Sequence, residues 1–380
     1  MSDITHKRVP LPHINDELLW KIFSKSHHKT VGKCRMLSKK WRHKLSSPYF
    51  VKQHFMENKL RDKQMIIGVG YLPFDEKSKW FLCVDVASGQ QFDFNIPIPI
   101  DNFGYYVLIG SDQGNICLKF SQGGFNSTLM ILNPLTRRMA FVTDKARKHC
   151  SHAVSLYAFS YVLDTIEYRI VHVYKKHYKD KVLSWTLYNS YEAEWTYSGN
   201  FQTKTQKLGP KNIVDKGVVY WIGWEGVRFE EPTSIITFSL QSRLFSEVNV
   251  PHEVRSSNNS LTNFNNGVGF ISYNNIGFTR EVVVWEITPK ANDKLGWEKM
   301  IKVSGIGIPY NPTIFVGKDI ISVMEFRGSF GSANDSESTD LLISRFKFMT
   351  ARRKHLLHRN WNENVYVKSI SMHLQGLYPV

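Results

Sequence analysis

The sequence has few cysteines and no long apolar run. Its four cysteines, Cys34, Cys83, Cys117 and Cys150, are scattered over 380 residues without paired spacing. This pattern argues against a disulfide framework and a structural zinc site, and it favours a reducing compartment. No apolar segment approaches the roughly 18 residues that a membrane-spanning helix needs, and the N-terminus has no apolar signal-peptide core. We therefore expect no membrane association, and a location in the nucleus, the cytoplasm or both.

Motifs for catalysis and ligand binding are also scarce. His149, Cys150 and His152 bring metal-capable side chains together, but the two histidines would point to opposite faces of a strand. Gly68-Val69-Gly70 lacks the later glycine and the following helix of a phosphate-binding loop. A Gly-x-Ser-x-Gly nucleophile elbow is missing. We expect a non-catalytic protein with no cofactor and no metal site.

Residues 14–55 are dense in helix signals, unlike the rest of the chain. Asn15 is a good N-cap, because its side-chain oxygen can accept from a backbone N–H one turn later, and two acidic residues follow it. The first helix then presents one broad apolar face, made of Leu18, Leu19, Ile22 and Phe23. Short helices of this kind bury too little apolar surface to be stable alone. The module therefore needs a neighbour, either the body behind it or another protein.

Two further short helices are expected after a polar break. Thr30 can cap one, and Ser38 can cap the other, which carries Trp41 and stops at Ser46-Ser47-Pro48. The region is strongly basic, because residues 1–60 contain 13 Lys/Arg and 4 Asp/Glu and so hold +9 of the formal charge of +16. Such a charge suits an acidic protein partner. It would also suit nucleic acid, although no run has the density of a nucleic-acid-binding arm.

The chain after residue 64 is predicted to be an all-β domain. Apolar runs of mostly four to nine residues, rich in Val, Ile, Tyr, Phe and Trp, are separated by Gly, Asn, Asp or Pro. Two of the predicted strands are residues 154–162 and 182–189. Similar groups of strand-forming segments recur at intervals of roughly 40 to 50 residues, the period of four-stranded propeller blades. A β-propeller is expected, with a β-sandwich as the alternative. Residues 314–323 are predicted as one strand, 329–340 as a flexible loop, and the segment with His355 and His358 as solvated.

The helical region resembles an F-box. The family pattern of an acidic pair before a helix, an apolar pair, an arginine, a Val-Ser-Lys-x-Trp and a Pro-x-Phe is matched in order and spacing. The matching segments are Asp16-Glu17-Leu18-Leu19, Ile22-Phe23, Arg35, Leu37-Ser38-Lys39-Lys40-Trp41 and Pro48-Tyr49-Phe50. Asn15, Ser26-His27, Gly32 and Cys34 depart from the pattern. The resemblance implies docking on a Skp-family adaptor that links to a cullin. The residues expected at this surface, or packed directly behind it, are Ile14, Leu18, Leu19, Ile22, Phe23, Leu37 and Trp41.

The resemblance continues into the β region. Gly114-Asn115-Ile116-Cys117-Leu118, Asn133-Pro134-Leu135-Thr136 and Gly217-Val218-Val219-Tyr220-Trp221 are similar to segments of plant F-box proteins of the F-box-associated, kelch-like type. The resemblance implies a tail at 1–13, an F-box at 14–57, a linker at 58–64 and an F-box-associated β domain at 65–380.

A protein of this kind would be the substrate-recognition subunit of an SCF-type ubiquitin ligase. Its β domain would bind a target protein, whose identity and contact residues the sequence does not reveal. Two alternatives are a kelch-type propeller scaffold whose helices only cap the body, and a basic nucleic-acid-binding protein, which the charge distribution favours less.

Overall fold

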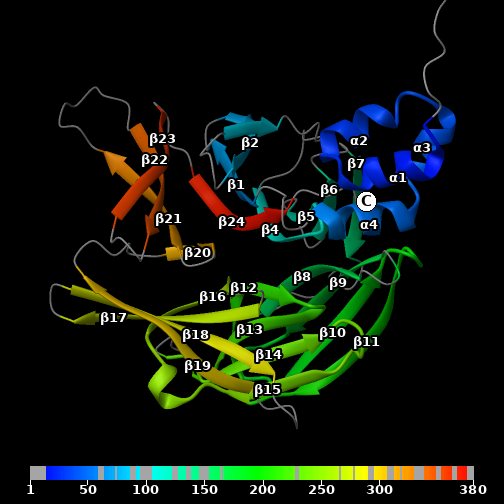
Figure 1. The fold of residues 1–380 in the computed structure, drawn as a ribbon. Helices are drawn as coiled ribbons and strands as arrows, with labels where there is room; N and C mark the ends of the chain where they lie inside the picture. Colours follow the sequence, from blue (N-terminus) through cyan, green and yellow to red (C-terminus); the bar gives the residue numbers. More distant parts are fainter. Residues whose placement is uncertain are drawn as a thin grey trace, which may run out of the picture.

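The computed structural model places a group of four helices beside a large β domain (Figure 1). The structure describes residues 14–58, 64–72, 75–85, 91–94, 105–121, 127–133, 138–144, 154–162, 165, 167–226, 231–264, 267–276, 279–289, 295–305, 312–316, 319–328, 338–347, 352–361 and 366–374. The His149–His152 group and most of the loop expected at 329–340 lie outside these residues. None of the helices in the described part has the length and apolar character of a membrane span.

The four helices are α1 (Asp16–Lys25), α2 (His28–Cys34), α3 (Lys39–Leu45) and α4 (Pro48–Asn58). Two of the predicted caps are confirmed. The Asn15 side-chain oxygen accepts from the backbone N–H groups of Glu17 at 2.6 Å and Leu18 at 3.0 Å. The Ser38 hydroxyl accepts from the N–H of Trp41 at 3.1 Å. Both contacts satisfy N–H groups that a helix start otherwise leaves unpaired.

The prediction for Thr30 is wrong, because α2 begins two residues earlier. The Thr30 backbone N–H donates to the carbonyl of His27 at 2.8 Å, so Thr30 lies inside the first turn. The short break between α1 and α2 leaves the His27 carbonyl in position to begin the helical hydrogen bonds. A backbone group thus sets the start of α2, and the threonine hydroxyl does not.

Helix α4 was not predicted from the sequence. Pro48 was interpreted as a stop for the preceding helix, but it is also the first residue of the next one. Proline suits this position because its ring fixes a helical φ and its missing N–H would have no partner there. The Ser47 hydroxyl accepts from the N–H of Phe50 at 3.3 Å and caps the new helix.

Six antiparallel four-stranded sheets, here called blades 1 to 6, make up the described β domain. Blade 1 has β24 (Tyr366–Leu374), β1 (Gln64–Leu72), β2 (Asp75–Asp85) and β3 (Gln91–Phe94); blade 2 has β4 (Tyr105–Asp112), β5 (Asn115–Ser121), β6 (Ser127–Asn133) and β7 (Arg138–Asp144). Blade 3 has β8 (Val154–Val162), β9 (Glu167–Lys175), β10 (Val182–Asn189) and β11 (Glu194–Gln202); blade 4 has β12 (Lys207–Asp215), β13 (Val218–Trp224), β14 (Ser234–Ser239) and β15 (Phe245–Asn249). Blade 5 has β16 (Asn258–Phe264), β17 (Gly267–Ile276), β18 (Thr279–Pro289) and β19 (Leu295–Gly305); blade 6 has β20 (Pro312–Val316), β21 (Asp319–Gly328), β22 (Ser338–Lys347) and β23 (Arg352–Trp361).

The six blades form a closed ring. The first strand of each blade contacts the first strand of the next, in the order β24, β4, β8, β12, β16, β20 and back to β24. Blade 1 combines the two ends of the domain, since β24 pairs antiparallel with β1, with Leu374 opposite Gln64. This arrangement is a β-propeller, and it excludes the β-sandwich alternative. Radial repetition leaves only short strand edges exposed.

Two of the predictions for blade 6 are wrong. The run 314–323 is divided between β20 and β21, which pair antiparallel with Val316 opposite Asp319. The segment with His355 and His358 is the strand β23 rather than a solvated segment, because it pairs along its length with β22. Its many basic residues hid the strand signal, which depends on apolar alternation.

Apolar residues fill the spaces between neighbouring blades. Between blades 3 and 4, Trp221 and Phe238 are fully buried, and the ring centres of Phe238 and Trp185 are 5.1 Å apart. A corresponding cluster lies between blades 4 and 5 and includes Phe270, which is also fully buried. Apolar contacts between side chains of neighbouring blades therefore hold the ring together, whereas hydrogen bonds join the strands within each blade.

Candidate adaptor-binding surface

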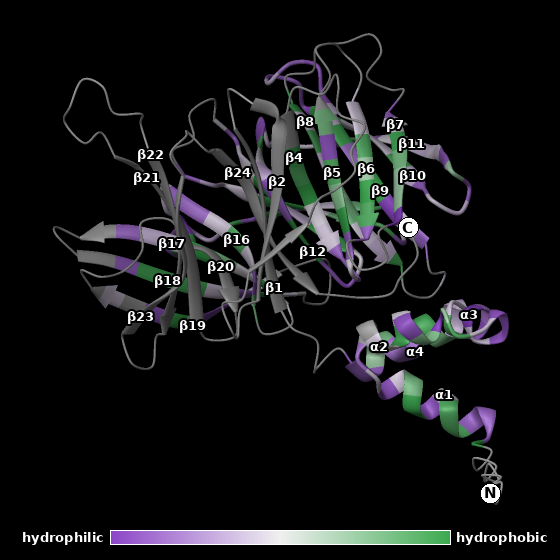
Figure 2. Cartoon of the chain, turned by 90° about the horizontal axis from the view of Figure 1, so that it is seen from above, coloured by the Kyte–Doolittle hydropathy of each residue, from purple (hydrophilic) through white to green (hydrophobic). Residues whose placement is uncertain are grey.

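Helix α1 exposes a row of apolar side chains. Ile14 is 47% exposed, Leu18 is 53% exposed and Ile22 is 46% exposed. They follow one another at intervals of four residues, so they share one face of the helix and its N-terminal extension. Figure 2 shows apolar segments along α1, which lies at the outer edge of the helical group. These three residues, here called the α1 row, are free to meet another protein.

A second exposed apolar spot lies between α2 and α3. Leu37, which the sequence predicted for this surface, is 74% exposed, and its neighbour Met36 is 78% exposed. Sequence reasoning missed Met36 because it lies in a turn, outside the helical spacing used to find apolar faces. The only available signal was two consecutive large apolar residues before the Ser38 cap.

The other three predicted residues lie behind the surface. Leu19, Phe23 and Trp41 are half-buried, and the rings of Phe23 and Trp41 meet edge to face with centres 5.0 Å apart. Edge-to-face pairs of this kind add about 0.5–1.5 kcal/mol beyond their buried area. The pair joins α1 to α3, so these residues hold the α1 row in position and offer little surface of their own.

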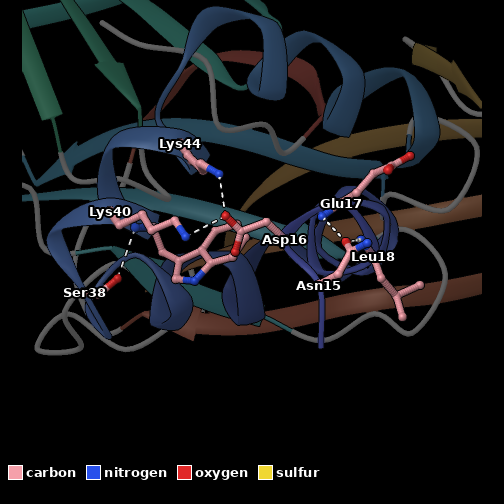
Figure 3. A network of polar contacts seen from close by, with 8 residues as sticks. Asn15, Asp16, Glu17, Leu18, Ser38, Lys40 and Lys44 are labelled. Carbon is pink, nitrogen blue, oxygen red and sulfur yellow. Dashed lines mark hydrogen bonds and ion pairs between the residues drawn. The ribbon is translucent and has the colours of Figure 1, made fainter. Parts of the chain in front are cut away.

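Asp16 connects the start of α1 to α3. Its carboxylate accepts from the Lys40 ammonium at 2.6 Å and from the Lys44 ammonium at 2.8 Å (Figure 3). The Lys44 ammonium also lies 5.4 Å from the centre of the Trp41 ring. In Figure 3, Leu18 points away from this pair of lysines. The contact therefore fixes the side of α1 that faces α3, and leaves the α1 row outward.

We expect this contact to be visible as an acid titration. Hydrogen bonds from Lys40 and Lys44 lower the pKa of Asp16 from 3.8 to about 2. Because the folded state favours the ionised carboxylate, the contact stabilises the module above pH 3.8 and is lost as the pH falls through about 2. NMR titration of the Asp16 carboxyl should show this low pKa, and the pKa should rise towards 3.8 in the Lys40→Ala/Lys44→Ala variant. An unchanged pKa in the variant would contradict the assignment.

Helix α4 supports α1 from the other side. The Trp20 indole N–H donates to the Gln53 side-chain oxygen at 2.8 Å. The Asn58 amide donates to the Ser24 carbonyl at 2.8 Å, and the His54 ring donates to the Ser26 carbonyl at 2.8 Å. Burial lowers the pKa of His54, which is consistent with a neutral ring. Helix α1 is thus held at its start by α3 and at its end by α4.

Gly32 offers a direct test of the departures from the F-box pattern. It lies inside α2, and a Cβ built there meets nothing within 4 Å. Gly32→Ala should therefore stabilise the helical module by up to about 1 kcal/mol, because glycine costs that much in a helix interior. Urea denaturation followed by circular dichroism would measure it.

The matched comparison for this variant is Gly223→Ala. There a Cβ would lie 2.5 Å from the Ser234 hydroxyl oxygen and 2.8 Å from Thr205, so this variant should lose stability. If Gly32→Ala lost stability as well, the description of α2 as an unstrained, uncrowded helix would be wrong.

The helical module also has a face towards the propeller. Its buried residues, which include Val31 and Phe50, belong to the same hydrophobic cluster as Tyr157 and Ile170 of blade 3. Burial, and secondarily the nearby charge of Arg138 on β7, lower the pKa of Arg35. The module therefore has a neighbour, as expected. It nevertheless leaves the α1 row exposed.

No group of three or more residues suited to a metal ion occurs in the described part of the chain. The described chain is thus a small module of four helices with an exposed apolar row, followed by a six-bladed propeller. That class of protein is confirmed by comparison with known families. Residues 11–53 match the model of the F-box domain, and residues 70–308 match the model of the F-box associated beta propeller domain. The chain belongs to the family of F-box proteins with an F-box associated β-propeller.

No curated protein matches the sequence closely enough to extend this assignment. Among solved structures, an uncharacterized protein of Listeria monocytogenes matches with 11% identity and a TM-score of 0.40, over 78% of this chain and 83% of its own. A candidate 6-phosphogluconolactonase of Bacteroides fragilis matches with 9% identity and a TM-score of 0.39, over 82% and 98%. Hydrazine synthase of Kuenenia stuttgartiensis matches with 8% identity and a TM-score of 0.32, over 68% and 67%. These likenesses are too distant to bear on function.

Proposed function

We propose that this protein is the substrate-recognition subunit of an SCF-type ubiquitin ligase. The observation that carries the proposal is the α1 row, which stays exposed although the helical module has the propeller as a neighbour. An apolar row that is not needed for internal packing, on a module of the F-box family, fits docking on a Skp-family adaptor. Leu37 and Met36 add exposed apolar area on the same module.

The charge of the module supports the same partner. Lysines and arginines dominate residues 1–60, which hold +9 of the total formal charge of +16. Electrostatic attraction of this size speeds the encounter with an acidic adaptor and depends on ionic strength. The adaptor would in turn connect the chain to a cullin, in the nucleus, the cytoplasm or both.

The propeller would hold a target protein near the ubiquitin-charged enzyme. The protein itself would make and break no bonds. Its contribution is proximity, since holding two reactants together removes much of the entropic part of a barrier. A rigid ring of six blades suits this role, because it fixes the distance between the adaptor and the target.

The direct test is reconstitution with purified partners. The full chain is mixed with a Skp-family adaptor and a cullin, and the mixture is separated by size-exclusion chromatography. Co-elution of all three supports the proposal. A chain that stays separate from the adaptor at micromolar concentrations would refute it, and would favour the alternative in which the helices only cap a propeller scaffold.

A further inference from the structure

Blade 3 has two chemically different ends. Its strands alternate in direction, so the turns β8–β9 and β10–β11 lie at one end, and the β9–β10 turn and the β11–β12 connection lie at the other. The first end carries Tyr161, Tyr168, Tyr188 and Trp195, which belong to the hydrophobic cluster shared with the helical module. A nine-residue strand such as β9 separates the two ends by about 30 Å. The second end is therefore remote from the helical module.

That second end carries a group of exposed lysines. Lys176, Lys179 and Lys181 lie in or beside the β9–β10 turn, and Lys204 lies in the β11–β12 connection. None of these four has an ion-pair partner in the part of the chain that the structure describes. Lysines without a carboxylate partner keep their full charge available for a ligand.

A buried lysine joins the two segments into one surface. Lys175 is only 2% exposed, and its ammonium donates to the Asp180 carbonyl at 2.7 Å and to the Thr205 carbonyl. The Thr203 backbone N–H donates to the Lys181 carbonyl at 2.8 Å. These contacts cross from one connection to the other, so the lysines are displayed on a braced support.

An aromatic side chain lies within the same surface. Tyr178 is 45% exposed, and the Lys207 ammonium lies 5.6 Å from the centre of its ring. We call Lys176, Lys179, Lys181, Lys204, Lys207 and Tyr178 the lysine face. A half-exposed tyrosine among lysines can pack against an apolar side chain of a ligand while the lysines meet its charges.

Two carboxylates close to the lysine face, those of Asp180 and Glu247, bind groups of the connections. Asp180 accepts from the His177 backbone N–H at 2.8 Å. Glu247 accepts from the Thr205 hydroxyl at 2.7 Å and from the Lys204 backbone N–H at 3.2 Å. They stabilise the shape of the connections. The exposed Glu225 follows Trp224, which pairs with Lys207 at the same end, so the five lysines of the face stand against three carboxylates. The net charge is positive.

We propose that the lysine face docks an acidic, extended segment of a target protein. The inference rests on the proposed function, and it names the chemistry of the target and the end of the propeller that receives it. A peptide fits better than a nucleic acid, because a peptide can place its carboxylates opposite the lysines and avoid Asp180 and Glu247. A continuous phosphate backbone would have to pass both acids. Docking at this end also keeps the target clear of the adaptor-binding module.

Fluorescence anisotropy with the full chain tests the proposal. The probe is a fluorescein-labelled peptide of eight glutamates. A peptide of eight glutamines and a thymidine oligonucleotide of twelve nucleotides, each with the same label, are the comparisons. The variant Lys176→Glu/Lys179→Glu should weaken binding of the glutamate peptide at least tenfold. The control Lys216→Glu/Lys299→Glu changes the net charge equally at exposed sites outside the lysine face, and it should change binding less than threefold.

Each other outcome overturns the proposal. Equal loss in the variant and the control would mean that only the overall charge matters. Equal binding of the glutamine peptide would remove the charge argument, and tighter binding of the oligonucleotide through the same lysines would assign the surface to nucleic acid. Adaptor co-elution is measured for every variant. If the unmodified chain binds the adaptor, peptide results that contradict the expectation refute the role of the lysine face and leave the proposed function standing. If the unmodified chain does not bind the adaptor, the proposed function itself is refuted.

Discussion

The double variant Leu18→Glu/Ile22→Glu is expected to lose adaptor binding by a factor of about 100 or more. Central apolar anchors of an interface each contribute about 2 kcal/mol or more. A glutamate in their place would also have to be buried as an unpaired charge, which is costly. Because Leu18 is 53% exposed and Ile22 is 46% exposed in the free chain, folding should change little. Isothermal titration calorimetry against a Skp-family adaptor would measure the affinity.

The control is Leu244→Glu/Met300→Glu, which makes the same chemical change at exposed positions of the propeller. Leu244 is 69% exposed and Met300 is 38% exposed. This variant should bind the adaptor as the unmodified chain does. If the α1-row variant and the control bound equally well, while both kept the far-ultraviolet circular dichroism of the folded chain, the α1 row would not be the adaptor-binding surface.

The second large effect is expected in the propeller itself. Trp221→Ala should lower the free energy of unfolding by about 3–5 kcal/mol, the usual result of removing a buried tryptophan. Trp221 is fully buried on β13, in the cluster between blades 3 and 4. Its loss leaves a cavity that the neighbouring strands cannot fill, because interiors are close-packed. Urea denaturation followed by circular dichroism would measure it.

Trp221→Phe is the matched comparison. The indole N–H of Trp221 is buried and has no hydrogen-bond partner in the described part of the chain. Phenylalanine keeps an aromatic ring and removes this unpaired donor, so it should cost clearly less than alanine, about 2 kcal/mol or below. Equal losses for both variants would show that the indole N–H has a partner, such as a buried water, and that the loss does not come from the cavity.

Much of the fold followed from local patterns in the sequence. The short apolar runs with glycine and asparagine between them predicted the strands β8 and β10 with the bounds that the structure gives, Val154–Val162 and Val182–Asn189. The Asn15 and Ser38 caps were also readable, because each needs only one side chain and the backbone that follows it. The repeat of roughly 40 to 50 residues, which is the usual length of a four-stranded blade, indicated the propeller. The closed ring of six blades confirms it.

Other features could not be read from local patterns. Strand β12 (Lys207–Asp215) is polar and was missed, because its place is set by pairing with β13 rather than by its own alternation. Which face of α1 is outward was also hidden. Leu18 and Leu19 are adjacent and chemically identical, yet Leu18 is exposed and Leu19 is half-buried, and contacts such as Asp16 with Lys40 decide between them. Such contacts join residues far apart in the sequence, so composition and spacing carry no trace of them.

The pairing of β24 with β1 has a consequence for how the protein is made. On the ribosome the helices emerge early, but blade 1 must wait for a partner strand that is translated more than 290 residues after β1 ends. Until then β1 has an open edge, and open edges recruit other chains. A nascent chain that stalls before Tyr366 would carry the helical module and a propeller whose ring is not closed, because β1 would lack its partner β24. Each round of translation should therefore pass through an intermediate with an exposed strand edge, the kind of surface that chaperones bind.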